Sequence, residues 1–332
     1  MPVGFRQGRF DDPSRPNWDG SGPRPLAWAA WYPAAEEAVE QLLQASDATA
    51  SWFMYGSAAP DAPIGQFQRY PLVLLSHGTG GAALHLEWLA RDLARHGFIA
   101  LAINHHGNTS AEPYRAEGFL AWWERARDLS VLLDRFASES ACAGHVDLDR
   151  IHVAGYSLGG CTAAALLGAI TETSRFERSP RNPNFGRGPR EFPDLADHLP
   201  GLLENSAIFR DSWARMSDSY LDPRVRTALI LAPGNSLLGC NEDGLRRIRT
   251  PSRILVGGAD FVLPVALWLH ERLPSSALDR LPPEAGHYVF MPEPSDAGRI
   301  SAPVTCIDAE GVDRRAIHAQ TAALAVEFFR SV

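Results

Sequence analysis

The chain has 332 residues and a formal net charge of −8 at pH 7, and all 31 of its basic residues are arginine. The absence of lysine excludes a P-loop lysine, a Schiff base and a Ser-x-x-Lys nucleophile, since arginine does not act as a proton acceptor. The excess of acidic over basic residues argues against nucleic acid as the main partner. The sequence contains no run of about 18 apolar residues, so we expect no membrane span.

The first 70 residues form an extension that precedes the regular part of the chain. They predict two antiparallel edge strands, one near residues 27–32, and a helix near residues 36–45. The opening residues lack the basic and apolar regions of a signal peptide. We therefore expect a cytoplasmic protein, or an exported one if a leader has been removed.

Short apolar runs alternate with helical patterns from about residue 70 onward. The predicted strands lie at 71–76, 98–103, 150–154, 227–232, 252–256 and 276–281. The predicted helices lie at 84–96, 114–137, 158–169 and 314–330. Strands that are apolar throughout and separated by helices indicate an α/β domain with a mostly parallel sheet covered on both faces.

Residues 171–222 interrupt this alternation within a single predicted domain spanning 1–332. Their first half is rich in Arg, Pro, Asn and Gly and is expected to be irregular, whereas residues 196–220 have a helical pattern. An insertion at this place in such a sheet is suited to covering a site, so we predict a lid. A surface decoration away from the site is the alternative.

The sequence Gly-Tyr-Ser-Leu-Gly at 155–159 matches Gly-x-Ser-x-Gly and lies between a predicted strand and a predicted helix. A nucleophile on such a turn needs glycine neighbours, because the turn is strained and crowded. The turn also exposes the serine Oγ at the positive end of a helix. We therefore predict that Ser157 is a nucleophile.

A serine nucleophile needs a base, and the base needs an orienting acid. Asp260 follows the strand predicted at 252–256, and His287 follows the next strand, so both should lie at the same sheet edge as Ser157. Glu284 competes as the acid but shares the loop of His287. His318 competes as the base but lies inside the terminal helix pattern.

The segment Ser-His-Gly-Thr-Gly-Gly at 76–81 resembles the oxyanion loop of serine hydrolases. The backbone N–H groups of Thr79 and Leu158 are the expected oxyanion donors, and glycines in the loop let its backbone approach the substrate. We expect His77 to anchor this loop rather than act as a base.

Further candidates surround the predicted site. The residues predicted to contact substrate are Gly78, Tyr156, His105 and His106. For the two histidines, a structural role in their loop is the alternative. A metal site at the two adjacent histidines is disfavoured because neighbouring side chains diverge. The cysteines are far apart and form no Cys-x-x-Cys pair, so we expect no metal cluster, while one disulfide is possible in an exported protein. These residues are Cys142, Cys161, Cys240 and Cys306.

These motifs resemble the α/β-hydrolase superfamily, and within it the group of dienelactone hydrolase-related proteins and platelet-activating-factor acetylhydrolases. The resemblance covers roughly residues 70–170 and 224–330, includes the segment 93–100, and extends to the Arg-Pro-Leu and Trp-Tyr-Pro segments near the N-terminus. It implies the α/β-hydrolase fold and a serine esterase that acts on a small-molecule ester without a cofactor. It also implies the chain order Ser157, Asp260, His287. Dienelactone hydrolases carry cysteine at the position of Ser157, so lactone specificity does not follow.

Other functions remain open at this stage. The same three residues would serve an amidase, a peptidase or a carbamate hydrolase, and no feature of the sequence reports the leaving group. A non-catalytic binding protein on the same fold is a remote alternative. The sequence identifies neither the substrate nor the oligomeric state.

Overall fold

The computed structural model describes residues 1–65, 68–172 and 188–332. Most of the half of the insertion that was expected to be irregular lies outside these residues.

Ten strands of the described chain form one sheet in the order β11-β10-β9-β8-β6-β7-β2-β1-β5-β3, and β4 pairs with β12 apart from it. The strands are β1 (Val3–Pro16), β2 (Pro23–Pro33), β3 (Gln41–Leu42), β4 (Phe53–Met54), β5 (Ser57–Pro60), β6 (Tyr70–Ser76), β7 (Ile99–Asn104), β8 (Val146–Tyr156), β9 (Val225–Leu231), β10 (Ser252–Val256), β11 (Ser276–Arg280) and β12 (Glu293–Pro294).

The predicted parallel sheet is confirmed in its centre. Strands β7, β6, β8, β9, β10 and β11 run parallel to one another. The two predicted antiparallel strands are β2, which pairs with β7, and β1, which pairs with β2. Parallel strands end at one common edge, so the loops that follow β6, β8, β10 and β11 meet there.

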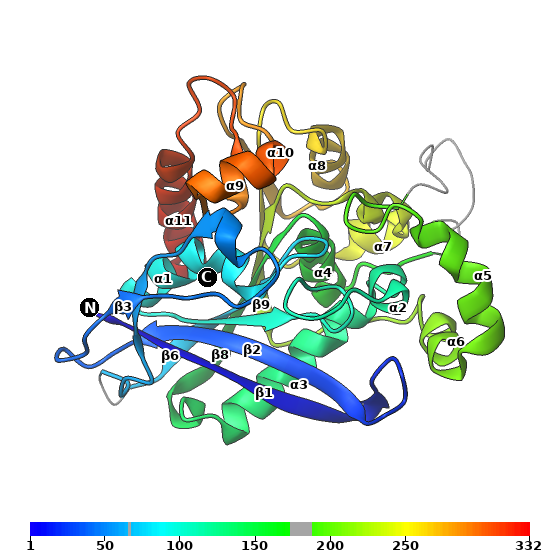
Figure 1. Cartoon of the computed structure of the whole chain (residues 1–332), viewed down its shortest axis with the longest axis horizontal. Coiled ribbons are helices and arrows are strands. Elements are labelled where there is room, and N and C mark those ends of the chain that lie inside the picture. Colours follow the sequence, from blue (N-terminus) through cyan, green and yellow to red (C-terminus); the bar gives the residue numbers. More distant parts are fainter. Residues whose placement is uncertain (66–67, 173–187) are drawn as a thin grey trace.

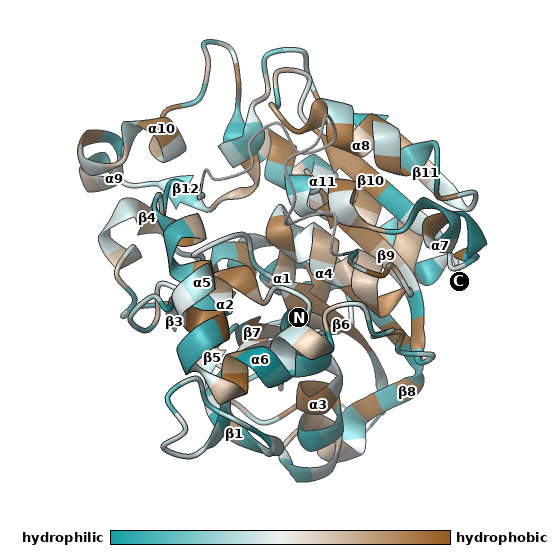
Figure 2. Cartoon of the chain, turned by 90° about the vertical axis from the view of Figure 1, so that its right-hand side faces the viewer, coloured by the Kyte–Doolittle hydropathy of each residue, from teal (hydrophilic) through white to brown (hydrophobic). Residues whose placement is uncertain are grey.

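Helices cover both faces of the sheet. Figure 1 shows α1 and α11 together on one side and α3 and α4 on the other. The helices are α1 (Glu87–Arg95), α2 (Ala116–Leu120), α3 (Glu124–Glu139), α4 (Leu158–Leu166), α5 (Leu195–Asn205), α6 (Ala207–Ala214), α7 (Glu242–Arg247), α8 (Leu263–His270), α9 (Asp296–Ser301), α10 (Pro303–Cys306) and α11 (Arg314–Arg330). Figure 2 shows apolar residues concentrated in central strands such as β9 and β10.

Two predicted helices differ from the structure. The helix predicted at 36–45 is wrong: the segment has no helix, and its Gln41 and Leu42 form β3, which pairs with β5. Val39, Leu42 and Leu43 have helical spacing, but only Leu43 is buried, so the segment has no apolar face packed on the core to stabilise a helix. The helix predicted at 114–137 is broken after α2. The break lets the buried Trp123 donate from its indole Nε1 to the Ser212 carbonyl of the insertion at 3.1 Å.

Candidate active site

The turn between β8 and α4 places Ser157 in a backbone conformation that non-glycine residues rarely adopt, with φ 55° and ψ −115°. Two glycines make this turn possible. A Cβ on Gly155 would overlap the Gly159 carbonyl, and a Cβ on Gly159 would overlap the Ser76 carbonyl of the neighbouring strand. The turn leaves the Ser157 side chain at the N-terminus of α4, where the helix dipole favours negative charge.

Ser157, His287 and Asp260 form one continuous chain of hydrogen bonds. The Ser157 Oγ lies 3.1 Å from His287 Nε2, and His287 Nδ1 lies 3.0 and 3.1 Å from the two carboxylate oxygens of Asp260. A carboxylate only accepts, so Nδ1 carries a proton and Nε2 of the neutral ring is left to accept from the serine hydroxyl. Three residues that lie far apart in the sequence therefore have the geometry of a nucleophile, a base and an orienting acid.

The surroundings hold this chain in place. Asp260 follows β10 and is 4% exposed, and its Oδ1 also accepts from the Val262 amide at 2.9 Å. His287 begins a short 3₁₀ helix after β11, and its carbonyl accepts from the Tyr156 hydroxyl at 3.1 Å. The Phe261 ring lies 4.4 Å from the His287 ring. Contacts on both sides thus restrict the movement of the imidazole.

The segment 76–81 lies beside the nucleophile, as predicted. Gly78 is close enough that a Cβ there would be 3.3 Å from the Ser157 Cβ. Neither the Thr79 amide nor the Leu158 amide donates a hydrogen bond to any residue that the structure describes, and both residues line the cleft at Ser157. The two amides are therefore available to a substrate oxygen.

A cleft of about 1170 Å³ opens above Ser157 and His287. Its wall is rich in aromatic and aliphatic side chains that come from several parts of the chain. They include Trp52, Phe53, Tyr114, Phe119, Trp122, Leu199, Leu238, Phe261, Val265 and Tyr288. A cleft of this size exceeds the range of about 300–1000 Å³ that is typical of small-molecule sites.

The described half of the insertion forms part of this cleft. Gly188 to Glu191 and α5 contribute to its wall, and Figure 2 shows α5 beside α2. Arg190 links the insertion to α10. Its Nη2 donates to Thr305 Oγ1 of α10 at 3.0 Å, and its guanidinium lies 5.6 Å from the centre of the Tyr288 ring. α6 is anchored to α3, because the Ser212 hydroxyl of α6 donates to the Glu124 carboxylate of α3 at 2.7 Å.

Two of the four residues predicted to contact substrate line the cleft, and two do not. Gly78 and Tyr156 line the cleft, whereas His105 and His106 are absent from its wall. His105 is buried beneath the oxyanion loop, and His106 lies 2.7 Å from Glu112 and accepts from the Trp18 amide at 3.4 Å. These two histidines follow a strand at the expected edge, but their side chains turn into the protein. The predicted contact of these two histidines with substrate is therefore wrong.

The competing bases and acid lie elsewhere. His318 is buried, stacks on Trp88 at 4.0 Å, and hydrogen-bonds to the Val289 carbonyl at 2.9 Å. Glu284 is exposed, and the carboxylate on His287 is that of Asp260. The anchoring role expected for His77 is confirmed, because its Nδ1 hydrogen-bonds to the Gly78 carbonyl at 2.7 Å.

Other predicted features concern metals, thiols and membranes. Among the described residues, no three His, Cys, Asp or Glu side chains gather as metal ligands. All four cysteines are buried and form no disulfide. Cys161 of α4 belongs to the hydrophobic core, as expected of a small apolar residue, and its thiol lies 3.4 Å from the Gly234 carbonyl. No helix in the described ranges has the length and apolar character needed to cross a bilayer.

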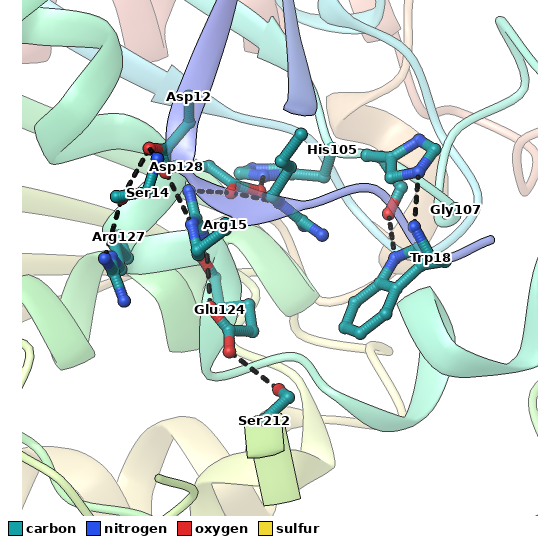
Figure 3. A network of polar contacts seen from close by, with 12 residues as sticks. Asp12, Ser14, Arg15, Trp18, His105, Gly107, Glu124, Arg127, Asp128 and Ser212 are labelled. Carbon is teal, nitrogen blue, oxygen red and sulfur yellow. Dashed lines mark hydrogen bonds and ion pairs between the residues drawn. The ribbon is translucent and has the colours of Figure 1, made fainter. Parts of the chain in front are cut away.

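Sequence reasoning missed a buried ionic cluster that supports the site from below. Figure 3 shows Arg15 of β1 among three carboxylates. It pairs with Asp12 at 2.6 Å, Glu124 at 2.9 Å and Asp128 at 2.8 Å. Burial alone would raise the pKa of Asp128, but Arg24 and Arg15 hold that pKa well below its ordinary value. Arg and carboxylate residues at helical spacing in 124–128 were the available signal, but the same spacing also occurs on exposed helix faces.

The chain is similar in sequence to known hydrolases over part of its length. A platelet-activating factor acetylhydrolase of Canis lupus familiaris is 28% identical over 171 residues, which cover 37% of this chain and 38% of that protein. Cutinase est2 of Thermobifida alba is 31% identical over 93 residues, which cover 27% of this chain and 28% of that protein. The matched segments thus span well under two thirds of either relative.

The fold also has a solved counterpart. A ferulic acid esterase from Streptomyces cinnamoneus superposes with a TM-score of 0.65 and 21% sequence identity, covering 99% of this chain and 89% of that chain. At this identity the likeness shows the fold alone. A model of the alpha/beta hydrolase family matches residues 72–298, which is more than half of the sequence. The chain therefore belongs to the alpha/beta hydrolase family.

Proposed function

We propose that this protein is a serine hydrolase that cleaves carboxylic esters through an acyl-enzyme on Ser157. The observation that supports this most is the unbroken hydrogen-bond chain from Ser157 through His287 to Asp260. The names of the relatives and of the structural neighbour, an acetylhydrolase, a cutinase and a ferulic acid esterase, favour an ester over an amide.

In the proposed mechanism, His287 Nε2 takes the Ser157 proton as Oγ attacks the ester carbonyl carbon. Asp260 holds the ring in the required tautomer and stabilises its positive charge. The amides of Thr79 and Leu158 donate to the oxyanion, which forms only in the transition state and the tetrahedral intermediate. When the intermediate collapses, His287 returns the proton to the leaving alcohol, and a water activated by His287 then hydrolyses the acyl-enzyme.

The cleft favours esters with a bulky apolar part. Its wall includes four large aromatic side chains, those of Trp52, Phe53, Phe119 and Trp122. A short acetyl ester would leave most of this apolar surface without contact, whereas an aryl or long acyl group would bury it. At about 25 cal/mol per Å² of buried apolar surface, we expect kcat/KM to rise with the size of the apolar group.

We further propose that the insertion predicted at 171–222 acts as a lid over this cleft through its described residues 188–222. The support is that Arg190 crosses from the insertion to Thr305 and that α5 contributes to the cleft wall. Arg190→Ala removes this crossing contact. If the insertion only decorates the surface, the variant will retain the parent preference among esters of increasing size.

The decisive experiment compares the parent with Ser157→Ala on a series of p-nitrophenyl esters. Loss of the nucleophile should lower kcat by several orders of magnitude, as roughly 10⁶ is lost in a serine protease. A fluorophosphonate probe should label the parent at Ser157 and leave the variant unlabelled. Hydrolysis by Ser157→Ala at the parent rate would refute the assignment, and faster cleavage of matched amides than of esters would refute the ester preference.

A further inference from the structure

A second chain of polar residues lies beneath the oxyanion loop, apart from the triad. Ser76 Oγ lies 3.0 Å from His105 Nε2, and His105 Nδ1 lies 3.1 Å from Asp128. All three residues are at most 1% exposed and none lines the cleft, so this Ser-His-Asp arrangement cannot meet a substrate. It does fix the end of β6, from which the oxyanion loop emerges.

His77 connects this buried layer to the loop. Its Nδ1–H donates to the Gly78 carbonyl at 2.7 Å, and its Nε2 accepts from the His105 amide at 3.2 Å. A carbonyl can only accept and an amide can only donate, so both contacts require the neutral ring with its proton on Nδ1. The Gly78 carbonyl belongs to the same peptide unit as the Thr79 N–H. In a trans peptide the two groups point in opposite directions, so holding the carbonyl inward directs the N–H outward.

Arg125 of α3 lies directly below His77. Its Nη2 donates to the His77 carbonyl, lies 3.4 Å from Ser76 Oγ, and lies 3.5 Å from His77 Nδ1. The side chain is 1% exposed, and its Nε and Nη1 have no acceptor among the described residues. It forms no direct ion pair with a carboxylate of these residues, and the charge of Asp128 on the same helix acts on it without contact. A buried charge without a direct counterion destabilises a fold. This residue is therefore better explained by what it does to the loop than by a gain in stability.

The charge of Arg125 also acts on His77. Burial, the Arg125 charge and the neighbouring His105 together lower the pKa of His77 well below its ordinary value, with a small contribution from His85. Protonation would place a second N–H against the His105 amide and lose that contact. A fixed positive charge beside the ring thus favours the form that the loop geometry requires.

From these contacts we infer that Arg125 is a positioning residue for the Thr79 amide: it anchors the His77 carbonyl and keeps His77 in the neutral form whose Nδ1–H holds the Gly78 carbonyl. This inference rests on the proposed function, in which the Thr79 amide binds the oxyanion. Because the oxyanion exists only after attack, misplacing this amide should lower kcat and leave KM nearly unchanged.

The first test is Arg125→Met, with Arg127→Met on the same helix as the matched control. We expect Arg125→Met to lower kcat about 10- to 100-fold with KM within about threefold, since removing one oxyanion donor outright costs about 10²–10³. Its melting temperature should match or exceed that of the parent, because an apolar side chain replaces an unpaired buried charge. The control should keep the parent kcat. An unchanged kcat for Arg125→Met, or a loss that follows a lower melting temperature, would overturn the inference.

A second pair of variants addresses the loop without changing Arg125. In His77→Asn the side-chain amide lies near the position of Nδ1 and can still donate to Gly78, whereas in His77→Gln it lies near Nε2 and cannot. We expect His77→Asn to keep kcat within about tenfold of the parent and His77→Gln to lose about 10²–10³, the cost of an oxyanion donor.

The outcomes separate the inference from the proposed function. Equal activities of the two His77 variants would overturn the positioning role while leaving the triad intact. Failure of the parent enzyme to cleave esters and to react with fluorophosphonate at Ser157 would overturn the proposed function and this inference together.

Discussion

The buried histidine of β8 allows a quantitative prediction about acid stability. His152 is 0% exposed, its Nδ1 lies 2.8 Å from Thr227 Oγ1, and its ring stacks on Phe329 at 4.9 Å. Burial and the charge of Arg150 lower the pKa of His152 to about 4. In the unfolded chain a histidine has a pKa of about 6.5.

The sign follows from proton binding. Between pH 6.5 and 4 the unfolded chain binds a proton at His152 that the folded chain does not, so the free energy of unfolding falls as the pH falls. A difference of about 2.5 pKa units corresponds to about 3.4 kcal/mol in total, of which about 2 kcal/mol is lost between pH 7 and pH 5. In His152→Asn this loss is absent, while the amide can still reach Thr227.

Urea unfolding of the parent and of His152→Asn at pH 7 and pH 5 measures this difference. The variant should be less stable at pH 7, because it loses ring packing, and the gap should shrink by about 2 kcal/mol at pH 5. Other groups titrate in both proteins and cancel. Phe98→Leu is the control, because Phe98 packs on the same ring without titrating, so its gap should be equal at both pH values. An unchanged gap for His152→Asn would refute the reasoning.

Three further substitutions test the site and its support. Asp260→Asn should lower kcat about 10³- to 10⁴-fold, because it disturbs the histidine tautomer; ester hydrolysis within tenfold of the parent would exclude this acid. Gly159→Ala places a methyl group against the Ser76 carbonyl, so we expect a lower melting temperature and loss of fluorophosphonate labelling, and full labelling would contradict the strained turn. Asp128→Asn removes the carboxylate shared by two buried arginines and should lower the free energy of unfolding by about 3–5 kcal/mol; a loss under about 1 kcal/mol in denaturant titration would show that the cluster reorganises.

The central sheet could be predicted from the sequence because its strands are buried on both faces. The strand predicted at 252–256 and the helix predicted at 314–330 have the bounds of β10 and α11. The three residues of the triad could be proposed for a related reason. Each lies in the turn or loop that follows a parallel strand, and the carboxyl ends of such strands lie at one edge. The order of strands and motifs along the chain was therefore enough to predict that these three residues lie close together.

The buried charged residues beneath the oxyanion loop could not be predicted in this way. Arg125 and Asp128 lie one turn apart on α3, and such a pair usually belongs to a solvated helix face. Here that face is buried by β1, whose Arg15 lies more than a hundred residues earlier in the sequence. Only the pairing of β1 with β2, next to β7, brings the two segments together. No local pattern encodes that contact.

The buried cations beneath the oxyanion loop also show what the chemistry of arginine contributes to this site. Burial lowers the pKa of Arg125 to about 9, which still leaves the guanidinium protonated at neutral pH. A lysine starts from about 10.4, some two units lower than arginine, so the same surroundings would bring it close to neutral pH and leave its charge incomplete. With that charge reduced, His77 would bind a proton more readily and the Gly78 carbonyl would be held less firmly. The position below the loop therefore requires a cation that keeps its proton when buried, and arginine is the side chain that meets this requirement.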